Sequence, residues 1–164
     1  MTHHIKQLDR IAGNTIIQFT NVDPAKLKVD AVVEEQDTNL LLGKAPVIME
    51  TVESFSAMVE QMEQQIREIP GSVIVKKSKP KRLIAIVYDV DHTPICEEAW
   101  VKEVMQKIFS ECYKYKINVI AMPLLGTTYG KLTDETIIQL LQEILLKNRH
   151  HNPKKIFIYE KQED

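Results

Sequence analysis

The fold of this chain is decided by the stretch Ile117-Asn118-Val119-Ile120-Ala121-Met122-Pro123-Leu124-Leu125-Gly126-Thr127-Thr128-Tyr129-Gly130-Lys131-Leu132. It opens with a nearly continuous apolar run, 117–123, which is typical of a strand buried on both faces. Gly126 and Gly130 bracket the loop that follows, and glycine lets a backbone turn sharply and come close to a guest. Amides that converge in such a loop bind anions such as a diphosphate. The stretch predicts a buried strand, a ligand-sized loop and then an amphipathic helix.

The same glycines have a plainer interpretation, because a loop between a strand and a helix often needs glycine only for positive φ. Two commoner phosphate-binding patterns, G-x-x-x-x-G-K-[ST] and G-x-G-x-x-G, do not occur in the sequence. The usual nucleotide-binding folds are therefore disfavoured.

Length and composition predict one domain over residues 1–164. A domain of this size buries roughly 70% of its unfolded surface and needs no disulfide or metal. Cys96 and Cys112 stand in no metal-binding or redox spacing, and no long apolar span interrupts the chain. We therefore expect a cytoplasmic protein with no metal, no cofactor and no membrane contact. The net charge of −2 gives no overall attraction to nucleic acid.

Local patterns predict strands that alternate with helices. Helices are expected over 52–66 after Gly43, from a cap at Thr93-Pro94, and from about Thr133. Strands are expected at 15–19, 29–33, 72–75, 83–88, 117–123 and 154–159. This order predicts a three-layer α/β/α fold with a mixed, largely parallel central sheet.

The segment from Met122 to Gly130 resembles the phosphate loop of macro domains, the fold best known for binding ADP-ribose and its derivatives. That family has a proline, an apolar pair and a G-[TS]-G-x-[YF]-G pattern, and here Thr128 takes the place of the middle glycine. The resemblance extends over roughly residues 15–160. It implies that phosphate contacts come from Leu125, Gly126, Thr127, Thr128, Tyr129 and Gly130.

Asp30 to Asp37 is similar to the family's D-A-[IV]-V-N-A-A-N segment. Glu34 stands at the first asparagine of that pattern, and Asp37 at the asparagine that contacts ribose. Gly43-Lys44-Ala45 replaces a run of three glycines, so that Gly43 and Lys44 become the implied contacts of the first phosphate loop.

Thr20-Asn21-Val22-Asp23 is similar to the family's G-D-[IV]-[TS] segment, with Asn21 at the aspartate that recognises adenine. Val22 follows it, and Tyr159 fits the place of an aromatic that packs on adenine. Asn21 can still accept a hydrogen bond through its side-chain oxygen.

The departures from the family pattern bring charged side chains into the expected ligand site. An ionised Asp37 accepts hydrogen bonds but cannot donate them, and with Glu34 and Glu35 it brings negative charge towards a diphosphate. Lys44 adds a side chain where glycine would let amides approach, although its ammonium supplies a point charge.

The resemblance implies a binding module for ADP-ribose or a related nucleotide, with weakened or altered specificity. The alternative is a macro-like scaffold that has lost the ligand and works through protein contacts. An ADP-ribosyl hydrolase that uses Asp37 to activate water is a weaker hypothesis, because the family's asparagine and glycine features are missing. We expect Gly126→Glu to reduce nucleotide affinity while the fold survives.

Other patterns carry less weight. The basic run 76–82 is typical of a solvated turn and holds no aromatic residue, so RNA is not an expected partner. Asp89, Asp91 and His92 are expected to form a turn and not a metal site. Cys96 is expected to pack in the core instead of acting as a nucleophile with His92.

Overall fold

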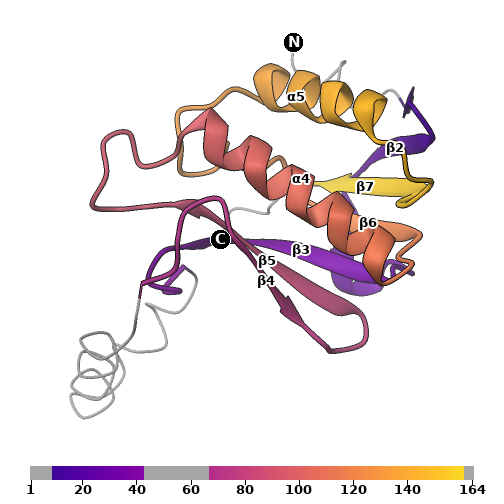
Figure 1. Cartoon of the computed structure of the whole chain (residues 1–164), viewed down its shortest axis with the longest axis horizontal. Helices are drawn as coiled ribbons and strands as arrows, with labels where there is room; N and C mark the ends of the chain where they lie inside the picture. The colour runs from indigo at the N-terminus through magenta and orange to yellow at the C-terminus, as the bar shows by residue number, and fades with distance from the viewer. Residues whose placement is uncertain (1–8, 43–66, 161–164) are drawn as a thin grey trace.

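The computed structural model describes residues 9–42 and 67–160. Its centre is a seven-stranded sheet in the order β1-β2-β7-β6-β3-β5-β4 (Figure 1). The strands are β1 (Arg10–Ala12), β2 (Thr15–Thr20), β3 (Ala31–Asp37), β4 (Val73–Lys76), β5 (Lys81–Tyr88), β6 (Val119–Met122) and β7 (Lys155–Tyr159).

The sheet is mixed and largely parallel, as the sequence predicts. Its central strands β2, β7, β6, β3 and β5 all run in one direction. Antiparallel β1 and β4 close the two sides. The carboxyl ends of the central strands therefore share one edge of the sheet, the carboxyl edge, and their amino ends share the opposite one, the amino edge.

Helices α4 (Glu98–Lys114) and α5 (Asp134–Lys147) lie side by side on one face of the sheet (Figure 1). A short 3-10 turn, η1 (Pro24–Lys26), follows β2. The helix predicted over 52–66 falls outside the described residues. Within the described residues, no helix is long and apolar enough to cross a membrane. The residues that α4 and α5 bury against the sheet include Val101, Val104, Met105, Ile108, Phe109, Ile137, Leu141 and Leu145.

Helix α5 begins where the sequence predicts. Thr133 is its N-cap, and the Thr133 side chain accepts a hydrogen bond from the Thr136 amide. Asp134 and Glu135 then stand in the first turn, where acidic side chains complement the helix dipole.

Helix α4 begins later than predicted, at Glu98 and not at Thr93-Pro94. The reason lies in where the preceding carbonyls point. The Ile95 carbonyl accepts from the amide of Asp89, and the Pro94 carbonyl contacts the His92 ring at 2.7 Å. Because these groups are bound by residues of the turn after β5, they do not begin a helical ladder.

The first strand, β1, was not predicted. It forms a hairpin with β2 in which Ala12 pairs with Thr15, so that Gly13 and Asn14 alone make the turn. Gly13 has a φ of 60°, which suits a tight hairpin turn. The Gly-Asn pair is a sequence signal for this hairpin that the prediction overlooked.

The six predicted strands are all present, with bounds that are shifted by one to four residues. The strand predicted at 29–33 runs from Ala31 to Asp37, with alternate residues buried along its whole length. The strand predicted at 117–123 covers only Val119–Met122. It starts late because the Ile117 amide donates to the Cys112 carbonyl of α4, and it stops at Pro123, which has no amide hydrogen.

Asp30 joins three strands just before β3 begins. Its carboxylate Oδ2 accepts from the amides of Asn118 and Val119 at 2.9 and 3.0 Å. Its own amide donates to the Val119 carbonyl, and its carbonyl accepts from the Lys81 amide. One residue therefore sets β3 against both β6 and β5.

We predict that Asp30→Ala lowers the free energy of unfolding by about 1–3 kcal/mol, because two backbone amides lose a charged acceptor. Asp30→Asn keeps one acceptor oxygen and should cost less. Urea denaturation of both variants measures the difference. Equal stability of wild type and Asp30→Ala would show that water replaces the carboxylate without loss.

Candidate functional site

The predicted ligand-binding residues meet at the carboxyl edge of the sheet. Asn21 follows β2, Asp37 ends β3, the loop 123–132 follows β6, and Tyr159 ends β7. Thr20 is paired with Tyr159, so Asn21 leaves the sheet beside that aromatic. Gly43 and Lys44 fall outside the described residues.

The loop after β6 is folded onto itself. Leu125 is fully buried, so its side chain belongs to the core and only its backbone can reach a guest. The hydroxyl of Thr127 donates to the Leu124 carbonyl at 2.7 Å, and the Thr127 amide donates to the same carbonyl. Among residues 9–42 and 67–160, no partner engages the amides of Thr128 and Gly130. These two amides are therefore the candidates for contact with an anion.

The glycines of this loop face the protein. Gly126 has a φ of 80°, and a Cβ there would lie 2.9 Å from the Cys96 sulfur and 2.9 Å from Leu132 Cδ1. A Cβ on Gly130 would lie 2.4 Å from the Gly126 carbonyl oxygen and 2.9 Å from Cys96 Cβ. Both positions therefore need glycine so that the loop can pack against Cys96.

This packing changes the expectation for Gly126→Glu. A side chain at Gly126 would enter the space of Cys96, Val101 and Leu132 instead of an open ligand site. The substitution would damage the fold, so it cannot test ligand binding.

A buried carboxylate supports the loop from below. Glu35 is 8% exposed and accepts a hydrogen bond of 2.6 Å from the Tyr88 hydroxyl. That hydroxyl in turn accepts from the Tyr129 amide at 3.4 Å, and the two tyrosine rings meet edge to face. Burial, with the nearby Glu35, raises the pKa of Tyr88 far above its ordinary value. Tyr88 therefore remains a neutral donor that couples β3 to the loop.

Asp37 is directed at its own loop. Its side chain is buried, and Oδ1 accepts from the amides of Asn39 at 2.7 Å and Leu41 at 3.3 Å. Its carbonyl also accepts from the Leu40 amide. The carboxylate therefore shapes the turn after β3.

The neighbouring side chains of β3 also have structural partners. Gln36 binds both the amide and the carbonyl of Leu42 through its side-chain amide, which holds the loop 38–42 in place. Glu34 forms a forked ion pair with Arg82, with a closest distance of 2.7 Å. Its negative charge is therefore compensated on the neighbouring strand.

The two residues predicted to contact a base differ in exposure. Asn21 and Val22 are exposed after β2, whereas the Tyr159 side chain is half-buried. The Tyr159 hydroxyl donates to the Val33 carbonyl at 2.8 Å, which fixes the position of its ring. Burial raises the pKa of Tyr159, so it is not an acid or base near neutral pH.

Sequence reasoning did not predict the groups that support the site, Tyr88 and Gln36, and it assigned Glu35 to the ligand side and not to the support of the loop. The signal for Glu35 was its place at a buried position of an alternating strand, where a carboxylate needs a partner. Lys131 was also left out, although it is exposed directly after Gly130 and could meet an anion there.

The polar group after β5 forms a turn, as predicted. Asp89 Oδ1 accepts from the Asp91 amide and pairs with Arg67 at 2.5 Å. The His92 ring contacts Trp100 edge to face, and Cys96 is buried. Within the described ranges, no cluster of His, Cys, Asp and Glu has the form of a metal site.

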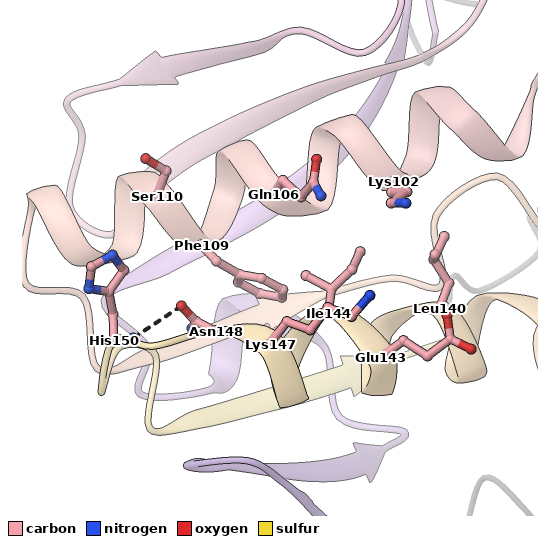
Figure 2. A pocket seen from close by; sticks show the side chains of 10 residues that line it. All are labelled: Lys102, Gln106, Phe109, Ser110, Leu140, Glu143, Ile144, Lys147, Asn148 and His150. Atoms are coloured by element: carbon pink, nitrogen blue, oxygen red, sulfur yellow. Dashed lines mark hydrogen bonds between the residues drawn. The ribbon is translucent and has the colours of Figure 1, made fainter.

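A separate groove of about 310 Å³ lies between α4 and α5 (Figure 2). Phe109 and Ile144 occupy the space between the helices, and Lys102 and Glu143 belong to its polar rim. The groove belongs to the helix layer and not to the carboxyl edge.

The chain matches no protein-family model and no curated protein sequence. Solved structures nevertheless resemble it. The macrodomain of Thermus aquaticus DarG is 19% identical, with a TM-score of 0.62 over 88% of this chain and 98% of that one. The Oceanobacillus iheyensis macrodomain with ADP is 15% identical, with a TM-score of 0.67 over 95% and 88%. A variant of the latter with ADPR is 15% identical, with a TM-score of 0.66 over 93% and 89%.

These similarities show that the chain has the macrodomain fold, the α/β/α architecture that the sequence resemblance implies. At such low identity they establish the fold alone.

We predict that Gly126→Ala lowers the free energy of unfolding by about 2 kcal/mol or more, because it combines left-handed backbone strain with overpacking against Cys96. Thr128→Ala, at an exposed position of the same loop, should stay within about 0.5 kcal/mol of wild type. Chemical denaturation measures both. Comparable stability of the two variants would contradict the glycine contacts described above.

Both cysteines should be unreactive in the native protein. Burial raises the pKa of Cys96 to about 12, and burial likewise raises that of Cys112 to about 12. A disulfide reagent at about pH 8 should label neither thiol until the chain unfolds. The neutral thiols stabilise the fold fully below the unfolded pKa of about 8.5, and this contribution falls as the pH rises towards 12. Rapid labelling of the folded protein would refute the prediction.

Proposed function

We propose that this chain binds ADP-ribose or a related nucleotide at the carboxyl edge, with weakened or altered specificity. The observation that carries the proposal is the loop after β6, in which the amides of Thr128 and Gly130 have no partner within the described residues. Amides held in this way bind phosphate groups. Lys131 adds a positive charge beside them.

The fold supports the same choice of site. Structures of the Oceanobacillus iheyensis macrodomain are described with ADP and, for a variant, with ADPR. Open α/β sheets bind ligands outside the carboxyl ends of their strands, which is where this loop lies.

The nucleoside end of the ligand is assigned to Asn21 and Tyr159. Pairing of Thr20 with Tyr159 brings the two residues together at the ends of β2 and β7. Asn21 is exposed and can accept from an exocyclic amine, while the anchored Tyr159 ring offers a surface for stacking.

The acidic residues explain why we propose altered specificity. One carboxylate oxygen of Asp37 accepts a hydrogen bond from its own loop, and the Glu35 carboxylate lies next to Tyr88, which contacts the phosphate loop. Negative charge near a diphosphate reduces affinity. We therefore expect this edge to favour a ligand that carries less phosphate charge than ADP-ribose does.

We do not extend the proposal to hydrolysis. A general base must reach the water that it activates. The Asp37 carboxylate is buried and held by the Asn39 and Leu41 amides. We therefore expect Asp37 to contribute to the stability of the turn after β3.

Isothermal titration with ADP-ribose and ADP tests the proposal. Thr128→Glu should weaken binding by about 10-fold or more, because it adds a carboxylate beside the phosphate amides without filling the core. Thr128→Gln has similar size and no charge, and should bind nearly as wild type does. Asn21→Asp, which gives adenine an anionic acceptor, should strengthen binding several-fold.

If neither ADP-ribose nor ADP gives a heat of binding at millimolar concentration, the result favours the alternative of a scaffold without a ligand. Binding that survives unchanged in Thr128→Glu would remove this loop from the site. Circular dichroism melting of each variant ensures that a loss of affinity is not a loss of fold.

A further inference from the structure

The amino edge of the sheet carries a row of lysines, although the protein as a whole has a net charge of −2. Lysines stand just before or at the start of four adjacent parallel strands, β7, β6, β3 and β5. These strand ends lie together, on the right of Figure 1. The exposed lysines are Lys28, Lys77, Lys79, Lys114, Lys116 and Lys154, with Lys81 and Lys155 half-buried.

Backbone hydrogen bonds hold this row in register. The amides of Lys154 and Lys155 both donate to the Asn118 carbonyl. Asn118 in turn donates to the Asp30 carboxylate, and the Asp30 carbonyl accepts from Lys81. The row therefore spans three strand spacings, about 15 Å, on a rigid edge.

A hollow of about 600 Å³ opens within this row. Its lining combines cationic, aromatic and amide side chains, with no carboxylate among the described residues. The lining residues are Tyr113, Lys114, Lys116, Asn118, His151, Asn152 and Lys154.

Aromatic rings lie among the lysines. Tyr113 is 55% exposed and stacks on the His150 ring at 3.8 Å, nearly parallel to it. Tyr115 lies under two ammonium groups, with Lys81 Nζ at 4.7 Å and Lys114 Nζ at 5.3 Å from its ring centre. The basic run 76–82 contains no aromatic residue, but the fold brings it one from the end of α4.

The acids of this region do not cancel the positive charge. The Asp30 carboxylate accepts from the amides of Asn118 and Val119. Glu111 is half-buried in the last turn of α4. The six exposed lysines outnumber these two acids at this edge.

We propose that this amino edge binds single-stranded nucleic acid. The lysines contact backbone phosphates, and a base extends the stack of Tyr113 and His150. A positive groove combined with exposed rings is the pattern by which proteins hold single strands. An acidic peptide or an anionic membrane would use the lysines but would have no need of an open ring face.

The site is separate from the proposed nucleotide site, because it lies at the opposite ends of the same strands. The two proposals can therefore fail independently. Excess ADP-ribose should not displace the nucleic acid.

Fluorescence anisotropy with labelled oligo(U) and oligo(dT) of about 20 nucleotides tests the proposal. We expect affinity to fall steeply between about 50 and 200 mM salt, with a logarithmic slope of about −2 to −4. Lys154→Glu and Lys79→Glu should each weaken binding about 5-fold or more and reduce the slope by about 1. Lys102→Glu, the same charge change on the helix layer, is the matched control and should bind as wild type does.

Tyr113→Ala should weaken binding by about 5-fold to 100-fold, whereas Tyr113→Phe keeps the ring and should bind normally. Because Tyr113 is exposed, the fold should survive its truncation, and thermal melting checks this. The proposal is overturned if Tyr113→Ala has no effect while polyglutamate or phosphatidylserine vesicles compete as well as unlabelled oligo(U). It is also overturned if Lys102→Glu loses as much affinity as Lys154→Glu, or if ADP-ribose displaces the oligonucleotide.

Discussion

The carboxylate of Asp30 is the constraint on which the rest of the structure depends. The ladder between β3 and β6 contains only two residue pairs, Ala31 with Ile120 and Val32 with Ala121. Asp30 extends this short ladder by binding the amides that precede and begin β6, while its carbonyl holds the start of β5. Because these strands are parallel, fixing their register at the amino ends also fixes how their carboxyl ends lie against one another. The loop after β6 and the turn after β3 are therefore positioned by an interaction at the far side of the sheet.

Much of the fold could be predicted because local signals and burial agree. Apolar periodicity and the Thr133 cap located α5, and continuous apolar runs located β5 and β6. The errors arose where tertiary contacts override a local preference. Thr93-Pro94 is a good start for a helix, but the carbonyls of Pro94 and Ile95 are engaged by the turn that follows β5. Strand β1 was missed because it is three residues long and has little periodicity to detect.

The candidate site was less accessible to sequence reasoning, because its chemistry depends on which residues the fold brings together. The resemblance located the loop, but it could not show that Gly126 and Gly130 face Cys96. Nor could it show that Tyr88 links Glu35 to the loop through one hydroxyl. The distribution of charge over the two edges could not be read from the sequence for the same reason. The interspersed lysines look unremarkable along the chain, and only the parallel topology collects them at one edge while Glu35 and Asp37 gather at the other.

The contacts of Gly126 also bear on the thermodynamics of recognition. Thr127 closes the loop onto Leu124, and both glycines pack against Cys96, two residues before α4 begins. This segment is thus already ordered in the folded protein. Ligand binding therefore costs the protein little additional conformational entropy. Discrimination between guests at this edge then rests on desolvation and charge, since the backbone cannot reshape itself around a poorer fit.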